Sequence, residues 1–403
     1  MKTTRREFIG AAAAGTAAAG LEPALPAARA ATIVANGAFD PWVEVHAANL
    51  RHNVAEIRRR VGGRPILAVI KNNGYGAGVV QAARLLEPMA EVSGLAVVKL
   101  HEAVTLRDTG IRKPILLMGP FDERDLAEAV ARRITPMLYT PLGPALERVA
   151  RTHQRSVGIH VCVDTGIGRV GIPHARAAEL VRDLAGRRGV RIEGLMMTFT
   201  EDADFDREQL ARFLALGSSL RAEGLDIGRQ HAASSYGLFQ RPDAFLDMVR
   251  PGMAVFGVYS EQSFRKTGLL DLRSALALRA RVIYVKMLRK GESAGYNRAY
   301  LAHDDVWVAT LPVGHADGWP RQAAKGAKVR IGGRLYRVVA SVSASHTIVE
   351  LGAESRVQVG DVATFFDWED GSRPEDVNAA CDASVYDLTM HLNPLLPRRI
   401  VSA

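Results

Sequence analysis

Several features that define a class of protein are missing from this sequence. Its 403 residues include only two cysteines, Cys162 and Cys381, too few for a disulfide framework. We expect two free thiols, although a pair would be possible in an oxidising compartment. After the N-terminal segment, no stretch reaches the roughly 20 apolar residues of a membrane-spanning helix. Histidine, cysteine and aspartate lack the paired spacing of a metal site, and no repeat recurs at a fixed period. We therefore expect neither a membrane anchor nor a metal.

The excess of basic residues is not gathered into one segment. The net charge is +9, and 48% of the residues are hydrophobic. Lys and Arg are spread along helical patterns, so we expect no nucleic-acid partner. The length suits one large domain with a smaller one.

The N-terminus has the pattern of a targeting segment. Arg5 and Arg6 lie in "TRREFIG", the small-residue run "AAAAGTAAAG" follows, and "ARA" ends at Ala30. This pattern resembles a twin-arginine signal peptide over residues 1–30, cut after Ala30. An amphipathic helix is the alternative, but the Ala/Gly run has no polar face. We expect export, which in a Gram-negative cell means a periplasmic protein.

Between about residues 64 and 258, short apolar runs alternate with helical patterns. The runs are "ILAVI", "GLAVV", "PILLMG", "ITPMLY", "GIHVCVDTG", "IEGLMMTF" and "MAVFGV". Amphipathic segments such as "DERDLAEAVARRI" between them predict βα units and a parallel sheet. About eight units fit a (β/α)8 TIM barrel better than an open sheet. We predict an α/β fold with this barrel over residues 45–270.

Beyond about residue 270 the hydrophobic period changes to two. "ALALRARVIYVKML", "VWVATLPVG", "AKVRIGGRLYRVVASVSA" and "VQVGDVATFF" alternate or run apolar between glycine turns, as antiparallel strands do. Residues 271–403 are predicted to form a C-terminal all-β domain, which a strand at 40–46 is expected to join.

A lysine ends the first predicted barrel strand. In "ILAVIKNNGYGAG" the apolar run stops at Lys71, and TIM barrels carry their chemistry at the C-terminal ends of the strands. Partial desolvation there would lower the pKa of the amine and favour its nucleophilic form. The simpler alternative is a solvated charge at the end of a strand.

Other polar residues also follow predicted strands. They are Tyr75 in "NNGYG", Arg169 in "VDTGIGRVG", Ser235 in "HAASS" and Arg250 in "VRPGMAVFG". With Lys71 they offer an amine for a Schiff base, donors for a phosphate and two cations. This combination suits pyridoxal 5'-phosphate as cofactor.

Five motifs together resemble the alanine racemase family. They are "AVIKNNGYGAG", "VDTGIGRVGI", "MVRPGMAVFGV", "AGYNRAY" and "LPVGHADGWPR", and the resemblance runs from about residue 42 to the end. It implies an isomerase, an amino-acid racemase of the EC 5.1.1 type. It also implies a homodimer in which the β domain of one subunit completes the site of the other.

The resemblance implies a role for each matching residue. Lys71 matches the lysine that holds the cofactor and acts as base on one face of the substrate α-carbon. Tyr296 matches the opposing acid/base, contributed by the other subunit. Arg250 matches the arginine at the pyridine nitrogen, and Arg169 the one near the phenolic oxygen and the substrate carboxylate. The implied phosphate contacts are Tyr75, Ser235, Gly252 and Met253. Two flanking groups are what racemisation needs, because a proton leaves one face and returns to the other.

Several positions depart from the family pattern. A tyrosine before "ADG" is replaced by His315, a Met-Asp pair by Ala344 and Ser345, and a tyrosine expected near Pro394 is missing. These losses predict a wider substrate wall, with Arg169, Ala344 and His315 as substrate contacts. We therefore expect a broad-spectrum racemase that accepts Lys, Arg and Met, since an apolar wall discriminates one methylene by only about 1–3 kcal/mol. An alanine-specific racemase with compensating neighbours is the alternative.

Two further substitutions lie in the barrel. Thr198 replaces a histidine that supports the arginine at the pyridine nitrogen, which puts catalytic efficiency in question. Cys162 replaces a lysine before "VDTG".

Two other functions on related scaffolds remain as alternatives. A decarboxylase would have an acidic residue at the pyridine nitrogen, where this chain has Arg250. A non-catalytic cofactor-binding protein would lack the β domain and Tyr296.

Overall fold

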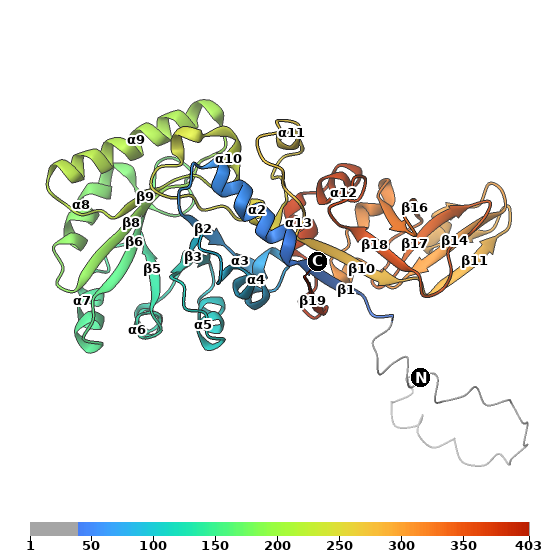
Figure 1. Ribbon diagram of the computed structural model, residues 1–403, viewed down its shortest axis with the longest axis horizontal. Helices are drawn as coiled ribbons and strands as arrows, with labels where there is room; N and C mark the ends of the chain where they lie inside the picture. Colours follow the sequence, from blue (N-terminus) through green and yellow to red (C-terminus); the bar gives the residue numbers. More distant parts are fainter. Residues whose placement is uncertain (1–38, 403) are drawn as a thin grey trace, which may run out of the picture. The chain divides into compact units, whose positions relative to one another are not determined.

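The computed structural model describes residues 39–402 (Figure 1). The expected signal peptide at 1–30 lies outside the described residues. Among residues 39–402, no helix combines the length and the apolar character needed to cross a membrane.

The first half of the described chain is a closed parallel barrel. Its strands, in their order around the sheet, are β2 (Ile66–Val69), β3 (Val92–Val97), β4 (Ile115–Leu117), β5 (Ile134–Leu138), β6 (Val157–Asp164), β8 (Val190–Met196) and β9 (Arg229–His231). The two-residue strand β7 (Ile172–Pro173) pairs with β6. Residues 247–251 close the sheet, because Arg250 N–H donates to Ala233 O and Leu67 N–H donates to Val249 O, both at 2.9 Å. The predicted barrel is confirmed.

Helices follow the strands and cover the barrel. They are α4 (Val79–Leu86), α5 (Leu100–Asp108), α6 (Glu123–Ala131), α7 (Gly143–Thr152), α8 (His174–Ala185), α9 (Ala203–Ala222) and the short α10 (Ser235–Gln240). Local chemistry sets their starts: Asp122 caps α6 and Asp202 caps α9, each accepting two backbone N–H bonds. In α9 the buried residues Leu210, Phe213 and Leu220 recur at helical spacing, so one face packs on the barrel.

The second half contains a nine-stranded sheet, antiparallel except for one pair. Its order is β11 (Tyr284–Leu288), β14 (Val306–Leu311), β17 (Thr347–Gly352), β16 (Arg334–Val339), β15 (Lys328–Ile331), β18 (Val362–Phe366), β10 (Leu276–Arg281), β1 (Trp42–His46) and β19 (Arg398–Val401). β1 runs parallel to β19 and antiparallel to β10. Alternate residues of β17 are buried, which accounts for the two-residue period of the sequence.

Shorter elements complete the second half. The hairpin β12 (Ser293–Ala294) and β13 (Tyr300–Leu301) forms a separate two-stranded sheet. Two helices, α12 (Pro374–Cys381) and α13 (Val385–Met390), stand between β18 and β19. Cys162 in β6 and Cys381 at the end of α12 are both buried and free.

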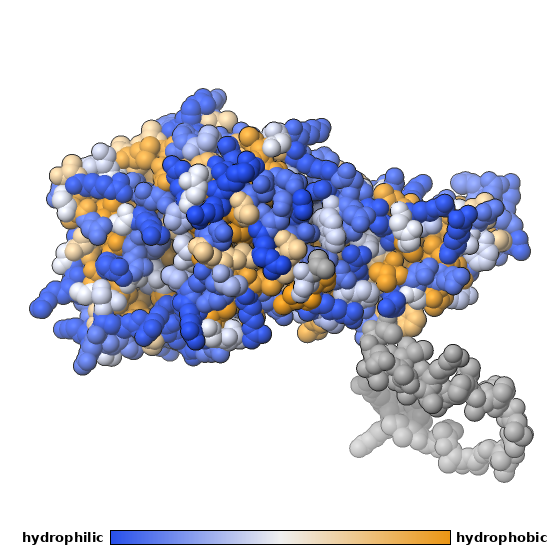
Figure 2. Space-filling model, viewed as in Figure 1, coloured by the Kyte–Doolittle hydropathy of each residue, from blue (hydrophilic) through white to orange (hydrophobic). Residues whose placement is uncertain are grey.

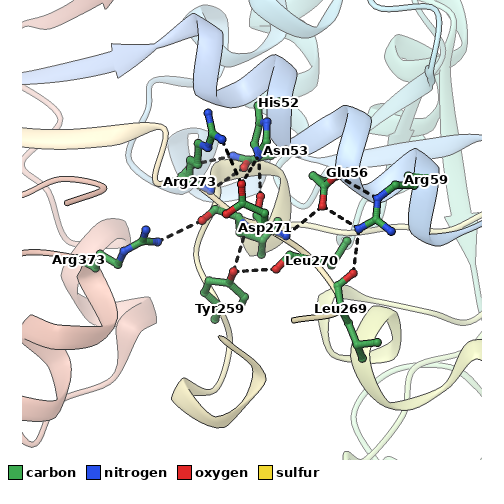
Figure 3. Close-up of polar contacts among 11 residues, drawn as sticks. His52, Asn53, Glu56, Arg59, Tyr259, Leu269, Leu270, Asp271, Arg273 and Arg373 are labelled. Carbon is green, nitrogen blue, oxygen red and sulfur yellow. Dashed lines mark hydrogen bonds and ion pairs between the residues drawn. The ribbon is translucent and has the colours of Figure 1, made fainter. Parts of the chain in front are cut away.

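The connection from barrel to β domain is tied to α2 (Ala47–Arg60), the helix that follows β1 (Figure 3). Asn53, fully buried, donates from Nδ2 to Arg273 O and accepts from Arg273 N–H at Oδ1, both at 2.8 Å. Tyr259 Oη donates to Leu270 O at 2.9 Å and accepts from Leu272 N–H at 3.0 Å. Because both ends of the segment are hydrogen-bonded to buried groups, it holds the two halves together rather than acting as a flexible linker.

Hydrophobic side chains gather inside the described part of the molecule. Trp319, Phe213, Phe256, Phe365 and Phe366 are among the largest fully buried side chains. The face drawn in Figure 2 is mostly hydrophilic, with hydrophobic residues in separate patches.

Candidate active site

A cavity of about 540 Å³ opens at the carboxyl end of the barrel strands. Each strand from β2 to β6, together with β8 and β9, contributes to its lining: Lys71 follows β2, Val98 follows β3, Met118 follows β4, Tyr139 follows β5, Cys162 lies in β6, Thr198 follows β8 and Ser235 follows β9. Arg250, which also lines the cavity, lies in the closing segment. All seven residues predicted to contact the cofactor line this cavity: Lys71, Tyr75, Arg169, Ser235, Arg250, Gly252 and Met253. The site therefore lies where TIM barrels carry chemistry.

A tight turn, α3 (Lys71–Tyr75), presents Lys71 to the cavity. Asn72 and Asn73 have φ values of 54° and 56°, a conformation that asparagine tolerates better than most residues. Asn73 is fixed from both sides, since its N–H donates to Glu102 Oε1 at 2.7 Å and its Oδ1 accepts from Val79 N–H at 3.1 Å. Burial, and then the charges of Arg169 and Arg250, lower the pKa of Lys71. The neutral, nucleophilic amine is thereby favoured.

Arg250 is buried at the base of the cavity and held by the ends of two strands. Its Nη2 donates to Met197 O at 2.6 Å and to Thr198 Oγ1 at 3.1 Å. Its Nη1 donates to His231 O at 3.3 Å. Burial lowers the pKa of Arg250 to about 10, so the guanidinium stays cationic at neutral pH. Thr198 thus supports this arginine with its hydroxyl.

Two buried histidines stand behind Arg250. His231 Nδ1 lies 3.4 Å from Arg250 Nη1, and His231 Nε2 lies 2.9 Å from His160 Nδ1. Because a guanidinium only donates, Nδ1 of His231 accepts and its Nε2–H donates to His160. Burial lowers the pKa of both imidazoles, that of His160 to about 4. Both rings are therefore neutral at physiological pH and add no positive charge behind Arg250.

Ser235, Gly252 and Tyr75 form a cradle that fits a phosphate. Ser235 Oγ accepts from Gly252 N–H at 3.0 Å and from Ala254 N–H at 3.1 Å. With two amides on its lone pairs, the hydroxyl is left to donate its proton to an anion. A Cβ at position 252 would lie 2.2 Å from Tyr75 Oη, so only glycine allows this approach. The amide of Gly252, expected to contact the phosphate, is bonded to Ser235 here.

Arg169 lies on a loop shaped by Asp164. Asp164 Oδ1 accepts from Gly166 N–H at 2.8 Å and from Gly168 N–H at 3.2 Å. Within residues 39–402, the side chain of Arg169 forms neither a hydrogen bond nor an ion pair. Burial raises the pKa of the neighbouring Cys162 thiol to about 11, so the thiol is neutral. The guanidinium is thus free to bind an anionic ligand group. This set of an amine, two guanidinium groups and a hydroxyl-and-amide cradle fits pyridoxal 5'-phosphate.

The structure does not bring Tyr296, His315 and Ala344 to Lys71 of the same chain. None of the three lines the cavity, and Tyr296, in the turn η3 (Tyr296–Arg298), is 73% exposed. They do lie near one another in the β domain. His315 N–H donates to Ser343 O at 3.0 Å, and Gly295 is packed on the start of the same 340–346 loop. The β domain therefore gathers all three on neighbouring loops.

Sequence reasoning missed several residues that line the cavity. Tyr386 of α13 reaches it from the C-terminal region, eight positions before Pro394. An aromatic ring thus reaches the cavity from α13, whereas the widening of the wall by a missing tyrosine near Pro394 stays a prediction. Glu201, Tyr139 and Met118 also line the cavity. Met118 and Tyr139 lie near the ends of the apolar runs "PILLMG" and "ITPMLY", a signal that could have identified them.

Known proteins share this architecture. The domain described as "Alanine racemase, N-terminal domain" matches residues 45–260, and "Alanine racemase, C-terminal domain" matches 275–400. The alanine racemase of Desulforamulus reducens is 33% identical over 333 residues, covering 81% of this chain and 89% of that protein. The alanine racemase of Symbiobacterium thermophilum is 34% identical over 372 residues, covering 90% and 97%.

Solved structures agree. Alanine racemase from the D-cycloserine producer Streptomyces lavendulae superposes with a TM-score of 0.84 at 28% identity, covering 91% of this chain and 98% of that chain. Alanine racemase from Bacillus anthracis with bound L-Ala-P gives a TM-score of 0.79 at 27% identity, covering 90% and 95%. Since both halves match over nearly their whole length, and since the cavity offers the donors that the cofactor needs, this chain belongs to the alanine racemase family of pyridoxal-phosphate-dependent isomerases.

Proposed function

We propose that this protein is a broad-spectrum amino-acid racemase that accepts long side chains such as those of Lys, Arg and Met. One observation carries the proposal: Ala344 and His315 lie on loops beside the one that bears Tyr296. If Tyr296 reaches the substrate α-carbon, these loops form the adjoining wall. Ala344 offers only a methyl group there, which leaves room for a longer side chain.

Residues of the barrel would hold the cofactor. Lys71 would bind it, Arg250 would face its ring nitrogen, and Tyr75, Ser235 and the backbone at Gly252 and Met253 would hold its phosphate. When bound, pyridoxal phosphate withdraws electrons from the substrate α-carbon and so makes the α-proton removable.

Two side chains would move that proton. Lys71 Nζ takes or returns it on one face, and Tyr296 Oη of a second copy does so on the other. The lowered pKa of Lys71 keeps part of the amine neutral and able to accept a proton. The cationic Arg169 would hold the substrate carboxylate, which fixes the α-carbon between the two groups.

The proposal includes a homodimer with shared sites. Tyr296 is 73% exposed and absent from the cavity of its own chain. A second copy must therefore place its β-domain loops over the barrel mouth. This arrangement would also shield the cavity from water.

An alanine-specific racemase remains the second candidate. Tyr386 favours it, since this ring, 37% exposed, lines the cavity and restores an aromatic wall.

The deciding experiment measures α-proton exchange by NMR in deuterated buffer, with chiral chromatography of the products. The mature protein, starting after Ala30, is tested with L-Ala, L-Arg, L-Lys and L-Met. We expect exchange and racemisation of all four. In Ala344→Met, kcat/KM for Lys and Met should fall about tenfold relative to Ala, because the added side chain narrows the wall. Activity on alanine alone in the unaltered protein would contradict the broad-spectrum proposal.

Export to the periplasm is the remaining part of the proposal. It is supported by the twin-arginine pattern "TRREFIG", and that route carries folded proteins, which suits a cofactor loaded in the cytoplasm. We predict that the double substitution Arg5→Lys and Arg6→Lys shifts the activity from the periplasmic to the cytoplasmic fraction of a Gram-negative host. The total activity should stay the same, because Arg5 and Arg6 are not among the residues that line the cavity. If the activity in the periplasmic fraction were unaffected by the double substitution, the protein would not use this route.

A further inference from the structure

Glu201 is an acidic residue at the mouth of an otherwise cationic cavity. It lies between β8 and α9, lines the cavity, and is open to solvent on one side. Its φ is 69°, a left-handed conformation that is uncommon for a residue other than glycine, asparagine or aspartate. Backbone strain of this kind persists only where the surrounding structure imposes it.

Buried side chains impose that conformation. Glu201 N–H donates to Asp206 Oδ1 at 3.1 Å, and Glu201 O accepts from Tyr236 Oη at 3.3 Å. The preceding residue is held too, since Thr200 N–H donates to Gln209 Oε1 at 2.9 Å. Asp206 and Gln209 are fully buried. The backbone N–H and C=O of Glu201 are therefore fixed by residues of α9 and α10, and its side chain projects from a rigid loop.

The carboxylate of Glu201 has no partner among residues 39–402: it forms no hydrogen bond and no ion pair there. Partial burial, and then the negative charges of Glu261 and Asp206, raise the pKa of Glu201, while Arg169 acts in the opposite direction. A cation placed at this carboxylate would relieve the repulsion from the two neighbouring acids. The carboxylate of Glu201 would thus be stabilised by a positively charged ligand group.

The charges of the cavity are arranged in two zones. Lys71 and the buried Arg250 make its base cationic and the exposed Arg169 adds a third positive charge, whereas the exposed Glu201, near Glu261 and Asp206, adds a negative one. An amino acid held by its carboxylate among the cations would direct a long side chain towards the mouth. A positively charged end of that side chain would then meet Glu201.

We infer that Glu201 is a specificity-determining residue, which binds the ammonium or guanidinium group of lysine-type and arginine-type substrates. This inference rests on the broad-spectrum function proposed above, since the methyl group of alanine is too short to reach the mouth. The competing role is a structural one, in which Glu201 only steadies Arg169.

The test is Glu201→Gln, which keeps the shape of the side chain and removes its charge. We expect kcat/KM for L-Lys and L-Arg to fall about tenfold to a hundredfold, the range for losing a charged hydrogen bond. The fall for L-Met, of similar length but uncharged, should be at least tenfold smaller. Glu261→Gln is the control, because it removes a nearby acid that does not line the cavity and so measures the general electrostatic effect. It should lower kcat/KM for L-Lys less than about threefold.

A binding measurement separates substrate recognition from catalysis. The compound 6-aminohexanoate has the carboxylate and the distal ammonium of lysine but no α-amino group, and hexanoate lacks the ammonium. Binding is measured by calorimetry on the holoenzyme. Glu201→Gln should raise the Kd of 6-aminohexanoate about tenfold or more, whereas the Kd of hexanoate should be nearly the same in the variant and the unaltered protein.

Two outcomes would overturn the inference. An equal loss for Lys, Arg, Met and Ala would assign Glu201 the structural role of steadying Arg169, and unchanged lysine kinetics would show that the carboxylate does not meet the side chain. Failure of the proposed function would look different, because the unaltered protein would then racemise alanine alone.

Discussion

At the scale of single residues, the contact between Tyr75 and Gly252 is the tightest constraint on the phosphate cradle. We predict that Gly252→Ala lowers the affinity for pyridoxal phosphate at least about tenfold, since a Cβ would lie 2.2 Å from Tyr75 Oη and 2.7 Å from Cζ. A spectroscopic titration of the apoenzyme measures this. Adding Tyr75→Phe should recover only part of the loss, because the ring carbon remains.

Gly186→Ala is the matched control for that substitution. Gly186 also has a negative φ, but a Cβ there would meet nothing closer than 3.5 Å. We expect its cofactor affinity to be unchanged and its stability to stay within about 0.5 kcal/mol. Equal titration curves for the two alanine variants would mean that Tyr75 moves aside without cost.

The residues around Lys71 set the reactivity of its amine. Burial, Arg169 and Arg250 lower its pKa from the ordinary value of 10.5. Nearby cations repel the ammonium form, so the proton leaves at a lower pH than in a free lysine. In the apoenzyme, acylation of Lys71, followed by peptide mass spectrometry, should therefore rise with pH through a midpoint below 10.5.

Arg169→Gln tests the electrostatic part of this shift. Removing one cation should move the midpoint of Lys71 acylation upwards, while burial continues to hold it below that of a free amine. A midpoint that moves downwards would contradict the assignment of Arg169 as a cation near Lys71.

At the scale of elements, the turn that carries Tyr296 depends on Gly295. Its φ is 76°, and a Cβ would lie 2.7 Å from Ala340 Cβ. We predict that Gly295→Ala reduces kcat about tenfold or more, because the turn must shift and displace Tyr296. The visible absorbance of the bound cofactor should not change, since barrel residues such as Lys71 and Arg250, and not this turn, would hold the cofactor.

Gly291→Ala separates backbone strain from contact. Gly291 has a φ of 84° but nothing within 4 Å of a Cβ. It therefore carries the strain of an alanine at positive φ, about 1 kcal/mol, without the clash. If kcat fell equally in both variants, the contact with Ala340 would not be what places Tyr296.

The sequence predicted elements and their order better than the contacts between distant ones. Lys71 could be placed at a strand end from the apolar run before it, and residues at other strand ends then converge because barrel strands are parallel. Tyr386 was missed because α13 reaches the cavity across more than 300 positions, and no local pattern marks such a contact. Glu201 was missed because it lies in an irregular loop, where burial and φ are set by α9 and α10.

At the scale of the whole molecule, the proposed shared site makes a stoichiometric prediction. Lys71→Ala and Tyr296→Phe should each be nearly inactive alone. When the two variants are unfolded, mixed equally and refolded, half of the dimers are mixed, and each mixed dimer has one intact site. About a quarter of the normal activity should return. If mixing restores nothing, Tyr296 does not act in the site of another copy.

The turn after Lys71 is also clamped by the far end of the chain. Gly76 O accepts from Arg398 Nε at 3.1 Å, across 322 positions, and Asn72 Nδ2 donates to Met390 Sδ at 3.6 Å, across 318. During synthesis the lysine thus leaves the ribosome long before the residues that enclose it. Tyr386, which lines the cavity, belongs to the same late segment. We therefore expect only the completed polypeptide to hold the cofactor firmly.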